Sequence, residues 1–229
     1  FNVSRETYYI LDNFRKLVIK KNRLINLISQ KTEENFIERH IIDCAQAIDF
    51  IDINSKSCTD IGSGAGLPGI VLAIVLKEKN IKMKMNLYEK SHHKSKFLKQ
   101  ISEKLKLDVE VFQKDIFKEK NLVSGSIIAR AFKPLPIILD LVEKKFKNYK
   151  NLVVFMGKNG KQMLEDSVKK WKFEYKEKRS LTSKDSFLIN IKNIKKNEQD
   201  WNFIYYKSKG WGWKNDDGNK PGGRLGYKK

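Results

Sequence analysis

The stretch Asp60–Ile70, with the sequence D-I-G-S-G-A-G-L-P-G-I, constrains the fold of this chain more than any other. A short β-prone segment ends in an acid, three glycines follow at alternate positions, and a proline precedes the apolar run Ile70–Leu76. Glycine permits a positive φ and a close approach by a ligand, and proline is tolerated in the first turn of a helix. The pattern predicts a strand, a tight turn and a helix, which is how an α/β domain that binds a nucleotide or cofactor begins.

The spacing of the glycines narrows the choice of ligand. G-x-G-x-G differs from the G-x-G-x-x-G of dinucleotide-binding folds, and no G-K-[ST] follows for a triphosphate. Asp60 stands directly before the first glycine. A carboxylate there suits the ammonium group of S-adenosylmethionine (AdoMet), which carries no pyrophosphate. A tight turn that binds nothing is the alternative.

The chain is strongly basic. It contains 47 Lys and Arg residues against 27 Asp and Glu residues, a formal net charge of +20 in 229 residues. Such a balance favours a polyanionic partner, nucleic acid above all, through contacts with phosphates and release of counterions. A lysine-rich surface that is merely solvated is the alternative. The length fits one domain of ordinary size with room for a core.

Cysteine usage and hydropathy exclude several classes of protein. Cys44 and Cys58 are the only cysteines and lack the spacing of metal ligands, so we expect no disulfide framework, no metal site and a cytoplasmic location. The apolar runs fall short of the roughly 20 residues that span a bilayer, so we expect no membrane partner. Because the sequence begins with Phe1 rather than methionine, we expect that an N-terminal piece precedes it.

Hydrophobic periodicity predicts helices before the glycine turn and alternating strands and helices after it. Apolar positions three or four apart predict one helix within residues 3–28 and a second that ends at about Phe50. The expected strands are Lys84–Tyr88, Val109–Phe112, Ile127–Ala129 and Leu152–Met156, the expected helices are His92–Leu105 and Pro136–Phe146, and Lys172–Lys178 with Phe187–Ile194 form a closing hairpin.

Polar residues at the strand ends are candidate ligand contacts, because open α/β sheets bind ligands beyond the carboxyl ends of their strands. Glu89 ends the second strand and can accept hydrogen bonds from both ribose hydroxyls of AdoMet or of NAD. Asp115 is placed either to meet an adenine amino group or to cap the next turn. Arg130 and Lys158 suit a phosphate, a carboxylate or a base edge, with a solvated surface charge as the alternative. His40 is a ligand, a proton carrier or a packing residue.

The sequence offers no general base and no nucleophilic Cys or Ser/His/Asp set with a supporting motif. A ring nitrogen of guanine with a free lone pair attacks a sulfonium methyl without being deprotonated. An enzyme for that reaction needs alignment and electrostatics more than acid–base groups.

Five short motifs occur in one order along the chain. They are N-L-I-S at Asn26–Ser29, R-H-I-I-D at Arg39–Asp43, the glycine turn, K-x-x-F-L at Lys94–Leu98 and R-A-F at Arg130–Phe132. Over residues 3–195 the chain resembles the ribosomal RNA small subunit methyltransferase G family, also called glucose-inhibited division protein B. The resemblance implies a class I AdoMet-dependent methyltransferase fold: Rossmann-like α/β, with a mostly parallel sheet, a C-terminal antiparallel hairpin and an N-terminal helical extension.

The resemblance also implies the reaction and part of the site. It implies methyl transfer from AdoMet to ring nitrogen 7 of a guanine in small-subunit (16S) rRNA. The expected cofactor contacts are Asp60, Gly62, Gly64, Gly66, Leu67, Glu89, Asp115, Ile116, Phe117 and Arg130. Of these, Gly62, Leu67, Ile116, Phe117 and Arg130 are positions that match the family's own contacts. The expected RNA contacts are Asn26, Ser29, Arg39, His40, Lys94 and Lys158, and the candidate catalytic residues are Arg130 and Lys158.

Two positions depart from the family pattern. Asp115 stands where relatives often have Arg or another residue that is not acidic, and Gly157–Gly160 varies an L-K-G pattern. The expected partner is small-subunit rRNA or the 30S particle, and the expected state is a monomer without metal. The alternatives are an AdoMet methyltransferase that acts on another RNA or a small molecule, and a non-catalytic RNA-binding protein.

The resemblance and a change of composition near residue 201 together divide the chain into three parts. We expect an N-terminal helical extension over residues 1–52, an AdoMet-binding methyltransferase domain over 53–197, and a tail over 198–229 that does not belong to the fold. Trp201, Trp211 and Trp213 stand in that tail among Gly, Lys and Asn, which a base-stacking RNA-binding tail or a disordered extension would also explain.

The hypothesis we favour for the tail is a frameshift. Codons permitted for Lys209–Gly223, translated from the second base, spell K-G-G-V-G-K-T-T-T-A-I-N-L-A, the phosphate-binding loop of a chromosome-partitioning ATPase. The residues from about 201 would then be an out-of-frame translation of a neighbouring gene. The nucleotide sequence decides this, because codons that do not permit the shifted loop exclude it.

Overall fold

The strand that leads into the glycine turn lies in the middle of a seven-stranded sheet. The computed structural model describes residues 3–197 of the chain. Strand β1 (Ser57–Ile61) pairs in parallel with β2 (Lys84–Tyr88) on one side and with β5 (Ser126–Ala129) on the other. In this register Asp60 is opposite Leu87 and Ile128. The predicted tail from residue 198, with its tryptophans, lies outside the described residues.

The other strands extend the sheet in both directions, in the order β3-β2-β1-β5-β7-β9-β8. Strand β3 (Val109–Phe112) is parallel to β2, and β7 (Asn151–Met156) is parallel to β5. Strand β9 (Phe187–Lys196) runs antiparallel to β7, with β8 (Trp171–Arg179) beyond it. Two short strands, β4 (Leu122–Val123) and β6 (Phe146–Lys147), pair separately. The mostly parallel sheet that the sequence predicts is therefore confirmed.

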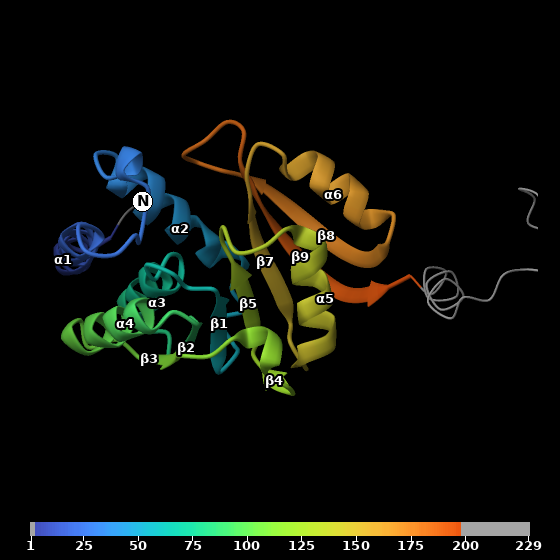
Figure 1. Ribbon diagram of the computed structural model, residues 1–229, viewed down its shortest axis with the longest axis horizontal. Coiled ribbons are helices and arrows are strands. Elements are labelled where there is room, and N and C mark those ends of the chain that lie inside the picture. Colours follow the sequence, from blue (N-terminus) through green and yellow to red (C-terminus); the bar gives the residue numbers. More distant parts are fainter. Residues whose placement is uncertain (1–2, 198–229) are drawn as a thin grey trace, which may run out of the picture. The chain divides into compact units, whose positions relative to one another are not determined.

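Helices cover both faces of this sheet (Figure 1). Helices α3 (Gly69–Glu78) and α4 (His92–Lys104) belong to one apolar cluster, and α5 (Leu135–Lys145) and α6 (Gly160–Val168) belong to the other. Consecutive strand residues alternate between them, so Ile127 packs with the α5 side and Ile128 with the α3 side. Burial on both faces explains the consecutive apolar residues of β5 and β7.

The segment before β1 is helical and shares its core with α3. Helix α1 (Arg5–Asn22) is followed by η1 (Gln30–Thr32), the π-helical turn η2 (Ile37–Ile42), α2 (Asp43–Ala45) and η3 (Gln46–Phe50). Phe14 and Val18 are fully buried in the cluster that contains α3. The first helix is shorter than predicted, because the Asn22 side chain accepts the backbone N–H groups of Leu27 and Ile28 and so stabilises a turn.

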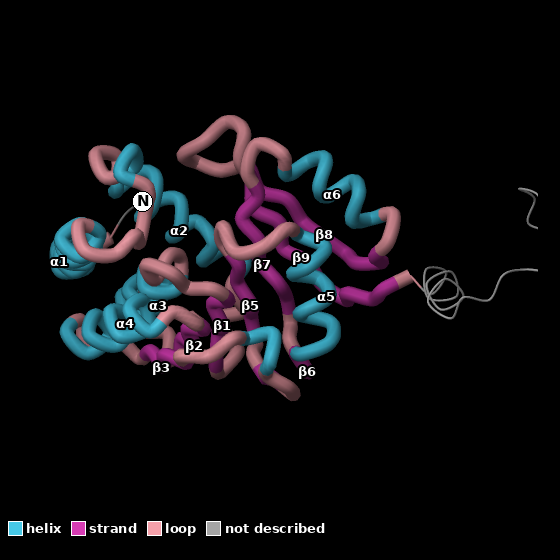
Figure 2. Tube along the Cα trace, in the orientation of Figure 1, coloured by secondary structure: helices cyan, strands magenta, loops and turns pink. Residues whose placement is uncertain are grey.

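The predicted second helix is divided into η2, α2 and η3, and the other predicted boundaries agree with the structure to within a few residues. The short strands β4 and β6 and the helix α6 were not predicted. The sequence analysis predicts no helix over Gly160–Val168, where α6 forms. Its apolar residues are few, and it covers the sheet with little more than Met163 and Leu164. Among residues 3–197, no helix is long and apolar enough to cross a membrane. The loops after β1, β5 and β7 and the β8–β9 loop all lie toward α2 (Figure 2).

Candidate functional site

A cleft of about 870 Å³ opens beyond the carboxyl ends of the parallel strands. Its walls come from the glycine turn, the ends of β2, β3, β5 and β7, the N-terminal helical segment and the β8–β9 loop. The predicted cofactor contacts that line it are Gly62, Gly64, Leu67, Glu89, Asp115, Ile116, Phe117 and Arg130. The predicted RNA contacts that line it are Ser29, Arg39, His40 and Lys94. The fold thus brings most of the predicted site residues together.

Four predicted site residues are not in the cleft wall. Asp60 is buried behind the glycine turn, Gly66 belongs to the turn but does not line the cleft, and Asn26 and Lys158 are exposed outside the cleft. Lys158 lies in the loop after β7, and that loop contributes Gly157 instead. These side chains are not placed to touch a ligand in the cleft, so their direct roles remain predictions.

The three glycines of the turn serve two different purposes. Gly62, Gly64 and Gly66 all have positive φ, at 77°, 55° and 86°. A Cβ on Gly62 would lie 2.1 Å from the Phe132 ring, and one on Gly66 would lie 2.5 Å from Ile70, so both positions are filled by packing. A Cβ on Gly64 would meet nothing closer than a carbonyl oxygen 3.8 Å away. Gly64 is therefore the point where the turn leaves space for a ligand.

Asp60 supports the turn from behind. Its side chain is 1% exposed, and Oδ2 accepts the backbone N–H of Gly69 at 3.0 Å, which ties β1 to the start of α3. Oδ1 has no hydrogen-bond partner in the described part of the chain. Burial raises the pKa of Asp60 to about 7 from its ordinary value near 3.8, against the lowering effect of the Gly69 N–H. The oxygen without a partner is a free acceptor close to the turn.

We expect Asp60→Asn to change how stability depends on pH. The pKa of Asp60 is higher in the folded than in the unfolded protein. Its contribution to the free energy of unfolding is therefore complete below about pH 4 and is lost as the pH rises through 7. For the shift to about 7, the loss between pH 5 and pH 8 is about 2–3 kcal/mol. Asparagine keeps an acceptor for Gly69 and removes the charge, so the variant should gain stability over the wild type as the pH rises. Urea unfolding at both pH values measures this.

The variant must be compared with the wild type, because His40 changes the pH dependence of stability in the opposite direction to Asp60. Burial, and then the charge of Arg130, lower the pKa of His40 to about 4. Its contribution to stability is therefore present above the unfolded value near 6.5 and is lost as the pH falls through 4. That contribution is common to both proteins and cancels in the difference. Equal pH slopes for wild type and Asp60→Asn would contradict the assignment.

Glu89 joins the end of β2 to the glycine turn. Its Oε2 accepts the backbone N–H of Gly64 at 2.9 Å, and its Oε1 accepts that of Ser91 at 2.7 Å. The side chain is 8% exposed and lines the cleft. Each carboxylate oxygen can accept a second hydrogen bond. Glu89 is thus held in one orientation and keeps acceptor capacity for ligand hydroxyls.

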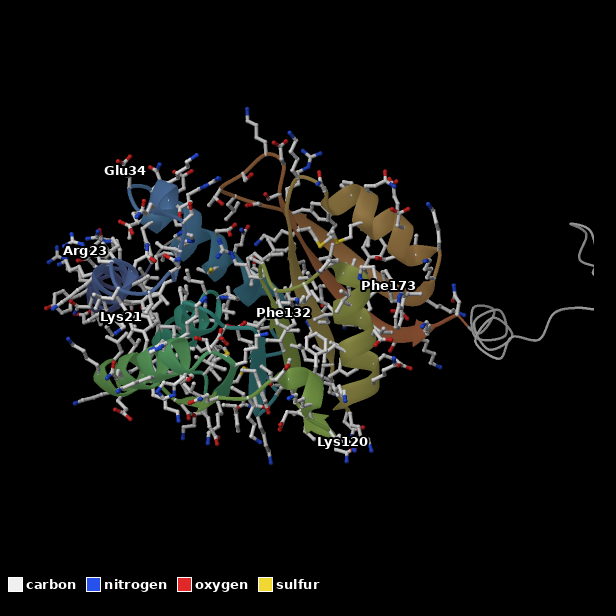
Figure 3. All side chains as sticks on the ribbon, viewed as in Figure 1. Lys21, Arg23, Glu34, Lys120, Phe132 and Phe173 are labelled. Carbon is white, nitrogen blue, oxygen red and sulfur yellow. The ribbon has the colours of Figure 1, made fainter. Side chains whose placement is uncertain are left out.

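An aromatic and apolar wall follows the end of β3. Asp115 caps η4 (Ile116–Lys118) by accepting the Phe117 N–H at 3.1 Å, so the capping role that the sequence left open is present. Within residues 3–197 its other oxygen accepts no hydrogen bond, and the residue lines the cleft. The rings of Phe117 and Phe132 are nearly parallel, with centroids 5.9 Å apart. Phe132 lies among the strand ends rather than at the periphery (Figure 3).

These residues fit AdoMet. Glu89 and Asp115 line the half of the cleft beside the turn, and Asp60 is buried just behind it. Carboxylates would repel the pyrophosphate of a dinucleotide, but they can accept hydrogen bonds from ribose hydroxyls, an amino group and an ammonium. The open space at Gly64 lies in this half of the cleft, between the carboxylates and the turn backbone. This half of the cleft therefore suits a cation with a nucleoside.

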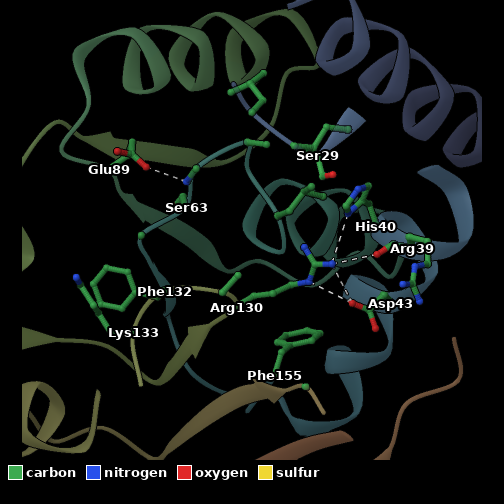
Figure 4. A pocket seen from close by; sticks show the side chains of 18 of the residues that line it. Ser29, Arg39, His40, Asp43, Ser63, Glu89, Arg130, Phe132, Lys133 and Phe155 are labelled. Atoms are coloured by element: carbon green, nitrogen blue, oxygen red, sulfur yellow. Dashed lines mark hydrogen bonds and ion pairs between the residues drawn. The ribbon is translucent and has the colours of Figure 1, made fainter. Parts of the chain in front are cut away.

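Arg130 occupies the other half of the cleft. It precedes Ala131, whose φ of 49° is in the left-handed region, and this turn directs Arg130 toward the N-terminal helices and Phe132 toward the glycine turn (Figure 4). Nε donates to Asp43 Oδ2 at 3.1 Å, and Nη2 donates to the Arg39 carbonyl at 3.0 Å. The guanidinium also lies 5.9 Å from the centre of the Phe155 ring. Arg130 is therefore a fixed cation rather than a mobile surface charge.

His40 is neutral and part of the same network. Nη2 of Arg130 can only donate, so Nδ1 of His40, 3.4 Å away, is the acceptor. His40 Nε2 then carries the proton and donates to the Thr32 hydroxyl at 2.9 Å, which in turn donates to the Ser29 carbonyl at 2.7 Å. The low pKa of about 4 agrees with this tautomer. His40 has the packing and hydrogen-bonding role that the sequence left as one possibility.

The structure adds residues that the sequence analysis did not select. Asp43, Phe132, Lys133, Phe155 and the β8–β9 loop residues Ser180 and Thr182 all line the cleft. Asp43 was visible as the last residue of the R-H-I-I-D motif, and Phe132 as the last of R-A-F. The loop residues carry no sequence pattern, because only the pairing of β9 with β7 brings their loop to the cleft. No thiol offers a nucleophile here, because burial raises the pKa of Cys44 to about 12.

Comparison with known proteins identifies close relatives and a common fold. The family described as rRNA small subunit methyltransferase G matches residues 8–191. The ribosomal RNA small subunit methyltransferase G of Pelagibacter ubique is 55% identical over 197 residues, which cover 85% of this chain and 92% of that protein. The protein of the same name from Rickettsia akari is 34% identical over 195 residues, covering 85% and 98%.

Solved structures with little sequence identity share the architecture. A SAM-dependent methyltransferase from Aquifex aeolicus superimposes with a TM-score of 0.53 at 14% identity, over 76% of this chain and 97% of that one. A putative O-methyltransferase from Klebsiella pneumoniae gives a TM-score of 0.52 at 12% identity, over 80% and 90%. With the strand order described above, these similarities confirm the class I methyltransferase fold.

Proposed function

Because the chain belongs to the rRNA small subunit methyltransferase G family, we propose that it transfers the methyl group of AdoMet to ring nitrogen N7 of a guanine in 16S rRNA. The observation that carries this proposal is the division of the cleft. Carboxylates and open backbone lie beside the glycine turn, and a fixed arginine lies opposite. One half suits a cationic nucleoside donor and the other suits the oxygen-rich edge of a guanine.

The chain's contribution to the reaction is alignment in a preorganised site. AdoMet supplies an electrophilic methyl group on sulfur, which a guanine N7 lone pair takes without prior deprotonation. Glu89 and the glycine turn hold the nucleoside, and Arg130 orients the acceptor base. Neutral His40 keeps Arg130 in place and moves no proton. No general base is required, which agrees with the groups found in the cleft.

A group of basic side chains at the cleft suits an RNA backbone. Arg39, Lys90, Lys94 and Lys133 line it, and all but the half-buried Lys94 are exposed. Within residues 3–197, none of their side-chain nitrogens has an ion-pair or hydrogen-bond partner. Unpaired cations release counterions when they meet phosphates. We therefore propose that these four residues, the basic rim, bind rRNA phosphates next to the target base.

Methyl transfer to isolated small ribosomal subunits tests the proposed function. Labelled AdoMet is incubated with the protein and with 30S particles from cells that lack the modification, and the labelled 16S nucleotide is identified after digestion. We expect one labelled guanine that carries the methyl on N7, and much less label in transfer RNA or nucleosides. Label on another RNA or on a small molecule would support the alternative methyltransferases. Binding of AdoMet with no label in any RNA would contradict the proposal.

We expect Lys94→Ala and Lys133→Ala each to weaken RNA binding about uniformly across RNA sequences. Each removes one phosphate contact, so the slope of log K against log salt should fall by about 0.7–0.9. Titration of the protein with 16S fragments at several salt concentrations measures this. Lys172→Ala is the matched control, because Lys172 is exposed on β8 and outside the cleft. A control slope that falls as much as the others would show that the binding is diffuse.

We also propose that the chain acts as a monomer in the cytoplasm. Sedimentation of the purified protein at several concentrations tests the monomer.

A further inference from the structure

Asp43 is a carboxylate in the cleft wall that contacts both Arg130 and the β8–β9 loop. It begins α2 and directs its two oxygens to different partners. Oδ2 accepts from Nε of Arg130 at 3.1 Å and lies 3.1 Å from Nη2. Oδ1 accepts from Gln46 at 3.0 Å and from the hydroxyls of Thr182 at 3.1 Å and Ser180 at 3.3 Å. Asp43 thus joins Arg130 to the β8–β9 loop.

We propose that Asp43 is a positioning residue for the methyl transfer described above, and that it acts by restricting what Arg130 can offer to substrate. This inference rests on the proposed function. Asp43 engages the Nε and Nη2 edge of the guanidinium, so that Arg130 presents only Nη1 to the cleft. It also offsets the positive charge of Arg130 beside the reacting base.

The first argument comes from counting donors. A guanidinium has five N–H groups, and its usual contact with guanine is bidentate, to O6 and N7 together. Such a contact would occupy the N7 lone pair that must attack the methyl group. Nε and Nη2 are already bound to Asp43, the Arg39 carbonyl and His40. In Figure 4 the remaining terminal nitrogen of Arg130 has no dashed line. Nη1 keeps two N–H groups, but a single nitrogen lacks the two-nitrogen fork of the bidentate contact, so Nη1 can bind an oxygen while N7 is left free.

The second argument concerns charge. Methyl transfer moves positive charge from the sulfonium to the guanine ring, and an uncompensated arginine close by would oppose that movement. The side chains of Arg130 and Asp43 are 19% and 15% exposed, so solvent screens their interaction only in part. Paired with Asp43, Arg130 keeps its hydrogen bonds while the pair has no net charge. The ion pair therefore favours the charge distribution of the transition state.

The acceptor of Nη1 is a single oxygen, either O6 of the target guanine or the carboxylate of AdoMet, and the test separates them. Asp43→Asn preserves size and an oxygen for Arg130 but removes the charge. We expect kcat on 30S particles to fall about 100-fold, the usual cost of a misplaced catalytic group. If O6 is the acceptor, the AdoMet dissociation constant from calorimetry stays near the wild-type value. If the carboxylate is the acceptor, that constant rises together with the fall in kcat.

A matched control and a rescue separate positioning from folding. Asp49→Asn removes a carboxylate from the same segment, one that pairs with Lys178 of β8 and not with Arg130, and it should leave kcat unchanged. Asp43→Ala leaves a space that opens on the cleft, so added formate should restore part of the activity. Formate should do nothing for Arg130→Ala. Rescue of kcat at a constant unfolding temperature is the outcome that a purely structural role would not produce.

Two results would overturn the inference. One is a wild-type kcat and AdoMet affinity in Asp43→Asn. The other is a loss of activity in Asp43→Asn and Asp43→Ala that follows the loss of folded protein, with no response to formate. The wild-type chain in the same assay keeps the proposed function separate, because failure of the wild type to label 16S rRNA would count against that function alone.

Discussion

Arg130→Ala is expected to lower kcat/KM for methyl transfer to small-subunit rRNA by about 10²–10³, which is the usual cost of removing one preorganised donor. The side chain is fixed by Asp43, the Arg39 carbonyl and the Phe155 ring, so its free nitrogen needs no reorganisation when substrate binds. Stopped-time assays with labelled AdoMet and 30S particles measure the change. Calorimetry on the same variant shows whether AdoMet binding contributes to it.

Arg130→Lys is the informative companion variant. Lysine keeps the charge but has neither Nε–H nor a planar fork, so it cannot bind Asp43 and the Arg39 carbonyl and still reach into the cleft. We expect the lysine variant to lose most of the activity that the alanine variant loses. Full activity in the lysine variant would show that only the charge at this position matters, and the geometric argument would then be wrong.

Glu89→Ala is expected to weaken AdoMet binding by about two to three orders of magnitude, because hydrogen bonds to a charged group are worth about 1.5–3 kcal/mol each. The substitution removes the acceptor that faces the cleft. It also leaves the N–H groups of Gly64 and Ser91 without their partner, which loosens the glycine turn itself. Isothermal calorimetry gives the dissociation constant directly.

Glu89→Gln should also bind AdoMet weakly, for a reason specific to this geometry. Both carboxylate oxygens accept a backbone N–H, so an amide nitrogen in place of either one would face another donor. Glu110→Gln on the neighbouring strand β3 is the control, because Glu110 is half exposed and pairs with Lys84 away from the cleft. An unchanged AdoMet affinity for Glu89→Gln would mean that Glu89 does not bind the cofactor.

Much of the fold could be predicted because local pattern and tertiary structure agree. The glycine turn predicts a strand before it and a helix after it, and β1 and α3 lie at those positions. The strands after the turn are short apolar runs with clear ends. Helix α6 was missed because it buries only a narrow face. The end of α1 was misplaced because a side chain, Asn22, stops the helix by bonding to the backbone beyond it.

The sequence pattern alone predicted which residues gather in the half of the cleft beside the glycine turn. Glu89, Asp115 and the glycines follow their strands directly, and the parallel sheet brings all carboxyl strand ends to one edge. The same rule placed Arg130 in the cleft, but it could not say where the guanidinium points. It also could not say that the Asp60 side chain is buried, because an acid at a strand end can turn either toward the ligand or into the core.

Only the tertiary structure decided how the other half is built. Asp43, Arg130 and Thr182 are far apart in the chain and lack a common periodicity, so no local pattern connects them. They meet because β9 turns back antiparallel to β7 and carries its loop to the N-terminal helices. Hydrogen bonds between such distant groups depend on the exact docking of elements. A sequence read locally shows which groups can take part in the chemistry, and the packing of elements decides which of them touch.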